Sequence, residues 1–416
     1  MNAEIVAIGT ELLLGFVVNS DTAYLGRVLA GCGVNCYRHV TVGDNPKRLA
    51  ETLKRALSRS DLVITCGGLG PTVDDITLET ISQVTGKPLI LHPQILQKIR
   101  RRFKRIGVRM PKNNARQALL PQGAIPFPNE IGTAPGFMMR VSSVRGTRLL
   151  VALPGPPQEL IPMVERHLIP RLRRFAGPVV IQSRTLKATG LTESEVDLKV
   201  KRLLALKGDV TVGIYAHPAQ VDLRITAKAK SPSAAKRLIA GVERKIRRRL
   251  GPLIFGADEE TLEGAVGKLL KEKKLTLGLA ESCTGGLLGH RITQVPGSSD
   301  YFRGGVIAYS NKIKKELLGV SSKILDAYGA VSPQVAEAMA IGARHLVGAE
   351  MGLSITGIAG PGGGTAKKPA GLVYMGLSSP RGTRVFKHRF SGDRATVKFK
   401  ASQTALNLVR CALLSR

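Results

Sequence analysis

The feature that most constrains the fold of this chain is the alternation of strand and helix patterns in residues 1 to about 170. Short apolar runs, such as residues 5–8 and 62–66, alternate with amphipathic stretches such as residues 47–58. This β-α-β order is typical of a parallel sheet with helices on both faces. Ligands bind to such folds beyond the carboxyl ends of the strands, so the candidate site residues are those that follow a strand.

A glycine-rich turn follows the strand-like run of residues 62–66 and precedes two acidic residues. Its sequence, Gly-Gly-Leu-Gly-Pro-Thr over residues 67–72, lets the backbone approach a phosphate closely, and the next helix presents free N–H groups. Two carboxylates after such a turn suit a hydrated divalent ion. The predicted phosphate-binding residues are Gly67, Gly68, Gly70 and Thr72, and the predicted metal ligands are Asp74 and Asp75. The alternative is a tight turn with capping aspartates.

Residues 176–256 change character, because their strand and helix patterns follow the order β-α-β-β-α-β. That order is typical of a ferredoxin-like α+β module with an antiparallel sheet. Between its helices there is no Gly-x-x-Gly loop of the kind that clamps RNA, and we find no catalytic constellation in it. We interpret this region as a spacer or interface module.

The last region, residues 258–416, contains a second junction of strand, turn and helix. An apolar run over residues 275–280 reaches Glu-Ser-Cys-Thr-Gly-Gly, and a helix pattern begins at Leu287. A hydroxyl or thiol at the N-terminal end of a helix can attack a carbonyl group while free N–H groups receive the developing negative charge. The alternative is an ordinary Ser or Thr N-cap on a core helix.

Two more strand ends in this region carry polar residues. A strand pattern over residues 304–308 runs into the segment 309–314, and a strand ending at Thr356 opens onto the glycine-rich loop 357–365. Because the ends of neighbouring parallel strands meet at one edge of a sheet, we expect these segments to converge with Ser282 on one cleft.

A serine–lysine pair is the chemistry that these residues best permit. No histidine lies at these strand ends, which argues against a Ser-His-Asp triad. Ser282 is the candidate nucleophile and Lys314, or Lys312, the candidate base. A lysine serves as base only if burial or a neighbouring positive charge such as Arg394 lowers its pKa from about 10.4 towards 7. Cys283 is the rival nucleophile.

The charge balance predicts attraction to anions. The chain has 62 basic and 30 acidic residues, a net charge of +32. The charge is concentrated in helical stretches such as residues 98–105 and 236–249, without the interleaved aromatic residues that base stacking uses. We therefore favour solvated basic faces over a dedicated nucleic-acid surface, and weak polyanion binding stays open.

The cysteines and the apolar runs indicate a cytoplasmic protein. Five cysteines, an odd number without metal-ligand clustering, fit reduced thiols. No apolar run reaches the length of a membrane span, and the N-terminus has the pattern of a strand instead of a signal peptide. We expect no membrane partner.

Long motifs in the right order resemble a known family. Residues 280–286, 309–311 with Lys314, 357–364 and 392–394 are similar to the CinA C-terminal domain, the nicotinamide-mononucleotide (NMN) amidohydrolase of bacterial pyridine-nucleotide salvage. Residues 9–11, 67–75 and 154–157 resemble its N-terminal half, which has the fold of molybdopterin-binding proteins. In full-length CinA that half is associated with metal-dependent ADP-ribose pyrophosphatase activity, and the middle region is described as KH-like.

The resemblance implies site residues, ligands and an assembly. The implied catalytic residues are Ser282, Lys314, Tyr309, Thr356 and Arg394. The implied substrate contacts in the same domain are Gly285, Gly286, Asn311, Gly357, Gly360, Gly362 and Gly363. NMN and ADP-ribose are the expected small-molecule partners, and a homodimer is the expected assembly. A divalent metal, with or without a monovalent ion, is expected at the N-terminal site, and no cofactor at the C-terminal one.

We therefore predict a multidomain α/β and α+β protein. The predicted domains are a molybdopterin-binding-like parallel α/β domain (residues 1–172), a ferredoxin- or KH-like module (176–256) and an α/β CinA domain (258–416). The predicted function is NMN deamidation, with ADP-ribose pyrophosphate cleavage as a second activity. The alternative is a non-enzymatic, competence-associated protein that binds molybdopterin or nucleic acid.

Overall fold

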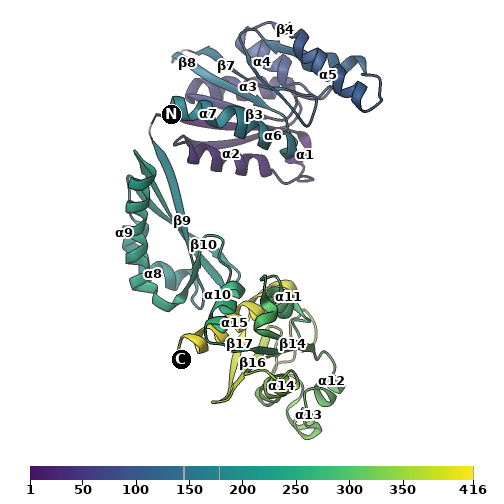
Figure 1. Ribbon diagram of the computed structural model, residues 1–416, viewed down its shortest axis with the longest axis vertical. Helices are drawn as coiled ribbons and strands as arrows, with labels where there is room; N and C mark the ends of the chain where they lie inside the picture. The colour runs from purple at the N-terminus through teal and green to yellow at the C-terminus, as the bar shows by residue number, and fades with distance from the viewer. Residues whose placement is uncertain (144–145, 178, 416) are drawn as a thin grey trace. The chain divides into compact units, whose positions relative to one another are not determined.

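The computed structural model describes residues 1–143, 146–177 and 179–415. The chain divides into two compact units, Met1–Gln182 with Ala227–Arg237 and Ser183–Thr226 with Leu238–Arg416 (Figure 1). Among the described helices, none combines the length and the apolar character that crossing a membrane requires.

The first unit is built on a six-stranded sheet with the order β2-β1-β3-β8-β7-β6. The strands are β1 (Asn2–Ile8), β2 (Asn35–Val42), β3 (Leu62–Cys66), β6 (Ile125–Phe127), β7 (Gly136–Ser143) and β8 (Gly146–Leu153). β2, β1, β3 and β8 pair in parallel, which confirms the predicted parallel α/β sheet. β7 and β6 extend it in antiparallel pairing, because β7 is adjacent to β8 in the chain and a short connection allows only that direction.

Helices cover both faces of this sheet (Figure 1). They are α1 (Thr10–Leu13), α2 (Ser20–Gly31), α3 (Pro46–Arg59), α4 (Thr77–Thr85), α5 (Pro93–Arg105), α6 (Pro157–Met163) and α7 (Ile169–Ala176). Ile5 and Ala7 of β1 join the core with α2 and α6, whereas Val6 and Ile8 join the core with α3 and α4. Alternate residues of β1 thus face opposite layers, which explains why its sequence is apolar throughout. A two-stranded sheet, β4 (Leu89–Leu91) with β5 (Leu119–Pro121), flanks α5 in sequence.

The middle of the chain has the predicted β-α-β-β-α-β order. Its elements are β9 (Val180–Ala188), α8 (Glu193–Leu204), β10 (Val210–His217), β11 (Gln220–Ala229), α9 (Pro232–Leu250) and β12 (Ile254–Ala257). The strands form a four-stranded sheet with the order β10-β11-β9-β12. A capping box starts α8, since the Thr192 hydroxyl accepts from Glu195 N–H and the Glu195 carboxylate accepts from Thr192 N–H.

The C-terminal domain has a five-stranded mixed sheet with the order β14-β13-β15-β16-β17. Its strands are β13 (Leu277–Glu281), β14 (Phe302–Ile307), β15 (Met351–Gly357), β16 (Leu372–Ser379) and β17 (Gly382–Arg389). Its helices are α10 (Leu262–Glu272), α11 (Leu287–Thr293), α12 (Asn311–Glu316), α13 (Ser322–Tyr328), α14 (Pro333–Leu346) and α15 (Arg394–Leu414). β14, β13 and β15 are parallel, so their carboxyl ends meet at one edge of the sheet.

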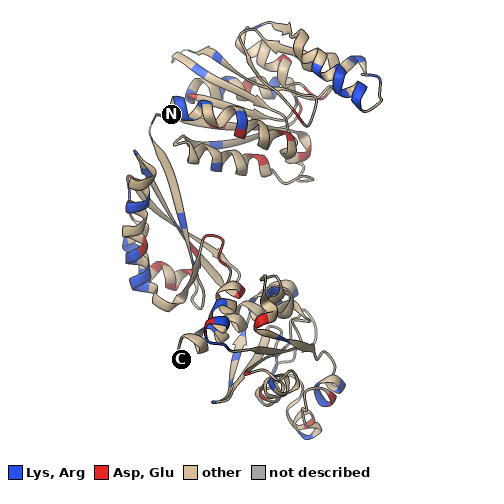
Figure 2. Ribbon diagram, in the orientation of Figure 1, with Lys and Arg blue, Asp and Glu red and all other residues tan. Residues whose placement is uncertain are grey.

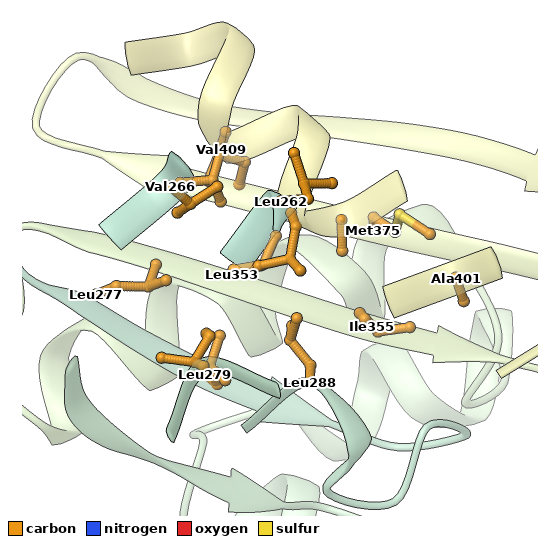
Figure 3. Close-up of a cluster of buried hydrophobic side chains, with 14 of the residues drawn as sticks. Leu262, Val266, Leu277, Leu279, Leu288, Leu353, Ile355, Met375, Ala401 and Val409 are labelled. Carbon is orange, nitrogen blue, oxygen red and sulfur yellow. The ribbon is translucent and has the colours of Figure 1, made fainter. Parts of the chain in front are cut away.

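Helices pack against both faces of the sheet and hold this edge in place. On one face, α10 and α15 pack on Leu279, Leu353 and Ile355 of the central strands (Figure 3). On the other face, α14 lies so close to the sheet that a Cβ atom on Gly352 would lie 2.1 Å from a backbone oxygen of the helix. Only glycine allows that approach. The two central strands therefore present their ends, Glu281 and Gly357, at fixed positions.

Candidate functional site

Ser282 is the first residue after β13. Its N–H donates to the Ile355 carbonyl of β15 at 2.9 Å, and its own carbonyl accepts from Gly285 N–H at 3.1 Å. Gly285 and Gly286 have φ values of 61° and 94°, a region that favours glycine and produces the sharp turn into α11. The serine is 8% exposed. Its hydroxyl is therefore held in a constrained turn at the strand edge, as the sequence predicts.

Lys314 lies beside this hydroxyl. The Ser310 hydroxyl caps α12 by accepting a hydrogen bond from Ile313 N–H. Lys314 lies on this helix, one turn after the capping serine. The lysine Nζ lies 3.1 Å from Ser282 Oγ and donates to the Ala308 carbonyl at 2.6 Å. The residue is 1% exposed, and burial lowers its pKa from the ordinary lysine value. The pair thus places an amine whose charged form is destabilised by burial next to a serine hydroxyl.

The alternative base, Lys312, and the alternative nucleophile, Cys283, lie in surroundings that do not suit these roles. Lys312 is exposed and lies 3.9 Å from Glu316, one helical turn along α12. Cys283 is buried, and burial raises the pKa of its thiol to about 11. A thiol with that pKa stays protonated near neutral pH and is a poor nucleophile. The geometry therefore favours the pair of Ser282 and Lys314.

Arg394 and Tyr309 form a second polar group in this domain. Arg394 begins α15, and its guanidinium donates to the Tyr309 hydroxyl at 2.8 Å and to the Gly360 carbonyl at 2.9 Å. These contacts use two of the five N–H groups of the guanidinium, so donors remain for a ligand. Tyr309 is 61% exposed. The arginine thus joins the loop after β14 to the glycine-rich loop after β15.

The remaining predicted residues surround these groups. Thr356 is fully buried, and its hydroxyl donates to the Ala330 carbonyl at 2.8 Å, so only its acceptor lone pairs stay available. Asn311 is the exposed first residue of α12. Gly357 ends β15, the backbone of Gly360 is buried against Arg394, and the last two predicted glycines are exposed in the loop: Gly362 and Gly363.

A buried carboxylate that the sequence analysis passed over occupies the N-terminus of α11. Glu281 is 3% exposed, and its oxygens accept from the N–H groups of Gly286, Leu288 and Gly289 at 3.0, 3.1 and 2.7 Å. This corrects the expectation that those N–H groups are free to receive an oxyanion. The physical reason is that a carboxylate is the strongest acceptor for a helix N-terminus. An acidic residue directly before a strand-to-helix turn was the available signal.

Two further side chains near Ser282 were not predicted. Thr284 is fully buried, and its hydroxyl has no hydrogen-bond partner within the described parts of the chain. Lys398 is half-buried on α15, one turn after Arg394, and its Nζ lies 3.7 Å from the position of a Cβ atom on Gly285. It forms no ion pair with any described residue. The i, i+4 spacing from Arg394 was the signal that could have identified it.

The glycine loop of the first unit forms a tight turn, and Asp75 caps it as in the alternative interpretation of the sequence. Gly67 and Gly68 have φ values of 105° and 66°, and a Cβ atom on Gly67 would lie 2.2 Å from the Ile8 carbonyl oxygen. Asp75 accepts from Gly70 N–H at 2.7 Å and from Thr72 N–H at 2.8 Å. The carboxylate of Asp75 therefore braces the loop with both of its oxygens.

A cleft beside this loop collects more acidic residues than the sequence motif contains. Its lining includes Asp74 and Asp75 together with Glu11, Asp44 and Glu159. Asp44 follows β2, and it was missed because nothing in its local sequence distinguishes it from a turn residue. Its Oδ2 accepts from Thr10 N–H at 2.9 Å.

The acidic cleft fits one kind of metal site. No three His, Cys, Asp or Glu side chains of the described residues are placed to hold an ion together. Mg²⁺ keeps several waters and binds through one or two carboxylates plus the phosphates of a ligand. Asp74 is exposed and available for that role, whereas Asp75 is engaged by the loop. The donors thus fit a hydrated divalent ion that arrives with a phosphorylated ligand.

Fold and sites together define a multidomain α/β protein with a phosphate-loop-like cleft in its first unit and a buried serine–lysine pair in its C-terminal domain. Three family models match the chain. They are described as "Probable molybdopterin binding domain" (residues 4–174), "Damage-inducible protein CinA KH domain" (183–256) and "CinA C-terminal domain" (259–413).

Relatives cover the whole chain. A "Putative competence-damage inducible protein" of Moorella thermoacetica is 47% identical over 410 residues, 98% of each chain. A "CinA-like protein" of Dictyoglomus turgidum is 45% identical over the full length of both. The chain therefore belongs to the CinA family. The crystal structure of competence/damage inducible protein CihA from Agrobacterium tumefaciens is 37% identical over 37% of this chain and 93% of that one, with a TM-score of 0.35.

Proposed function

We propose that the C-terminal domain hydrolyses the carboxamide of NMN to nicotinate mononucleotide and ammonia. The observation that carries the proposal is the buried Nζ of Lys314, 3.1 Å from Ser282 Oγ. Lys314 forms no ion pair with a carboxylate of the described residues, and burial penalises its ammonium form. Its lone pair is then available to accept the serine proton.

The first half of the reaction forms an acyl-enzyme. Ser282 Oγ attacks the carboxamide carbon while its proton passes to Lys314 Nζ. The tetrahedral intermediate then breaks its C–N bond, and the Lys314 ammonium returns the proton to the leaving nitrogen, which departs as ammonia. The Ala308 carbonyl accepts a hydrogen bond from Lys314 Nζ at 2.6 Å, which holds this nitrogen beside Ser282 Oγ.

Water completes the cycle at the same pair of residues. A water molecule attacks the ester carbonyl, Lys314 accepts its proton, and the proton passes to Ser282 Oγ as the ester C–O bond breaks. The product is the carboxylic acid, nicotinate mononucleotide. The net change is amide plus water to acid plus ammonia, and no cofactor enters the balance.

Cations around the pair suit the phosphate of a nucleotide. Arg394 keeps free N–H donors after its bonds to Tyr309 and Gly360, and the Lys398 ammonium lies beside Gly285 without a partner among the described residues. A planar guanidinium and an ammonium both bind phosphate oxygens well. Thr356 retains only acceptor capacity, which suits the N–H₂ group of a carboxamide.

The test is ammonia release from NMN, measured with the wild-type chain, Ser282→Ala and Cys283→Ala. We expect the serine variant to lose activity by at least 10³-fold, since removal of a nucleophile leaves only binding and electrostatic contributions. The cysteine variant should retain most of the activity. Undiminished release by Ser282→Ala would remove that residue from the mechanism.

We infer a second activity for the first unit, metal-dependent cleavage of the pyrophosphate of ADP-ribose. The supporting observations are the glycine loop, which allows close backbone approach, and the acidic cleft next to it. A divalent ion there would neutralise phosphate charge and polarise the bond that breaks. Asp74 would bind the ion, and Asp75 would hold the loop that faces the phosphates.

This second proposal is tested by release of AMP and ribose phosphate from ADP-ribose. Activity should appear with an added divalent metal, disappear with a chelator and persist in Ser282→Ala. Chelator-insensitive cleavage, or no cleavage with any divalent ion, contradicts it. Retention of a pterin through purification would instead favour a molybdopterin-binding module.

A further inference from the structure

Helix α5 carries a row of cations along one face. Lys98, Arg101, Arg102 and Arg105 follow the spacing i, i+3, i+4, i+7, which places them on one side of a helix. These four side chains line a groove of about 710 Å³, and the loop around residues 126–135 forms its other wall. Figure 2 shows Lys and Arg concentrated on this helix. A groove lined in this way has a strongly positive potential.

The cations of the groove outnumber its acids, since Glu130 is the one acidic side chain among the described residues that line it. None of the four forms an ion pair with a residue that the structure describes. The acid of the opposite wall, Glu130, is paired with Arg166 at 2.6 Å, and that guanidinium, with a smaller contribution from Lys98, holds the pKa of Glu130 below its ordinary value. Like charges three or four residues apart on a helix repel each other. The groove therefore has unsatisfied charge that an anion would stabilise.

One of the four cations has a structural contact. Arg102 donates to the backbone carbonyls of Glu130 and Ile131, so it ties α5 to the opposite wall and fixes the width of the groove. Lys98, Arg101 and Arg105 remain exposed to a ligand. These three residues are the contact set of the groove.

We propose that this groove binds the phosphodiester backbone of a single-stranded nucleic acid. Residues 98–105 rise about 10 Å along the helix, so their cations can contact successive phosphates of one strand. The ligand is single-stranded because the cations lie inside a groove, whereas the phosphates of a duplex lie on the outside of a wide cylinder.

The chemistry of the walls indicates how the strand is recognised. No aromatic side chain is among the described residues that line the groove, so bases have nothing to stack on. Binding through phosphates alone is independent of sequence and depends steeply on salt. The contact residues Lys98, Arg101 and Arg105 do not line the acidic cleft, although Thr133 lines both the groove and that cleft. The binding test does not require either proposed activity.

The test measures binding of a fluorescein-labelled twelve-residue oligothymidine to the full chain by anisotropy across a salt series. The groove variant is Arg101→Gln with Arg105→Gln. The matched control is Arg100→Gln with Lys104→Gln, which removes the same charge from exposed positions of the same helix that do not line the groove. We expect the groove variant to bind about tenfold or more weakly at 0.1 M salt and its log K–log salt slope to fall by about 1.4. The control should change binding less than threefold.

Three outcomes overturn the proposal. Equal losses in the groove and control variants would mean that the net charge alone attracts the oligonucleotide. Tighter binding of a duplex of the same length, with the same dependence on Arg101 and Arg105, would exclude a single-strand groove. Equal affinity for an inorganic polyphosphate of the same charge would show that the groove recognises phosphate chains in general and not a nucleic acid. Circular dichroism and thermal unfolding of both variants verify that α5 and its domain stay folded.

Discussion

The two candidate sites share a local architecture but differ in what their polar groups bind. Each follows a buried strand, uses glycines with positive φ and leads into a helix. In the C-terminal domain the key groups are buried and contact each other, with Lys314 Nζ 3.1 Å from Ser282 Oγ. In the first unit Asp75 bonds to its own loop, and Asp74 is exposed.

This difference in burial and contacts indicates what each site requires from its ligand. The serine–lysine pair is complete before substrate binds, so it suits covalent catalysis, in which pre-positioned groups reduce the cost of reaching the transition state. The glycine loop offers backbone approach and one available carboxylate, so it suits a ligand that brings its own phosphates and metal. The proposed amide hydrolysis depends on the pKa of Lys314, whereas the proposed pyrophosphate cleavage depends on a bound divalent ion.

The largest expected effect, and the strongest test of this difference between the two sites, comes from removing the buried amine of Lys314. Lys314→Met keeps the length of the side chain but cannot accept a proton, and NMN hydrolysis should fall by about 10²–10⁴-fold, the usual range for a general base. Most of the loss should appear in kcat, because the substrate contacts remain. ADP-ribose cleavage should not change. Ammonia release and phosphate-ester products from the same preparations measure both.

Lys312→Met is the matched control, since Lys312 lies on the same helix and is exposed. An equal loss in both lysine variants would mean that α12 matters only for folding. The unfolding temperature gives an independent readout. The pKa of Lys314 is lowered in the folded state, so the unfolded chain binds more protons between that lowered pKa and about 10.4. Burial of this lysine therefore costs stability at neutral pH, and the cost disappears as the pH rises through that window. Lys314→Met should therefore unfold at a higher temperature than wild type.

The next prediction separates the two aspartates of the first unit. Asp75→Asn should weaken ADP-ribose binding by about tenfold or more, because one amide oxygen cannot replace two carboxylate oxygens in bracing the loop. Asp74→Asn should raise the metal concentration needed for half-maximal activity and leave nucleotide affinity in the absence of metal unchanged. Calorimetric titrations of ADP-ribose, with and without metal, distinguish them. The same profile in both variants would contradict the assignment.

The smallest expected effect concerns Lys398. Lys398→Gln removes an ammonium beside Gly285, and we expect KM for NMN to rise about tenfold while kcat changes less than twofold. Nicotinamide riboside, which lacks the phosphate, should be hydrolysed equally by wild type and variant. Steady-state kinetics on the two substrates provide the measurement. A fall in kcat on both substrates would place Lys398 at the reacting amide instead of the phosphate.

The sequence predicted the parts of these sites that local patterns determine. The strand-to-helix turn at Ser282 and the tight glycine turn after β3 follow from apolar runs that end in glycines. Lys314 was predicted together with Lys312, and only the packing of α12 against the serine distinguishes the two.

The parts that were missed depend on which groups a side chain contacts once the chain is folded. Glu281 had no predicted role, and three helix N–H groups that seemed free are bound to it. Asp44 reaches the acidic cleft from a distant segment, and its local sequence does not distinguish it from a turn residue. Lys398 lies near Gly285, more than a hundred residues away in the chain, and only its spacing from Arg394 indicated it. The antiparallel strand β6 lies in a stretch with no clear alternation of apolar residues.

The most direct test of the account is an NMR titration of the lysine side chains, labelled with ¹³C at Cε, with Lys314→Met to assign the Lys314 resonance. The account predicts that this resonance titrates below the ordinary lysine value of about 10.4 and that kcat/KM for NMN rises with pH around the same midpoint. A Lys314 resonance that titrates with the bulk of the lysines would show a charged ammonium at neutral pH, and Ser282 would then have no base.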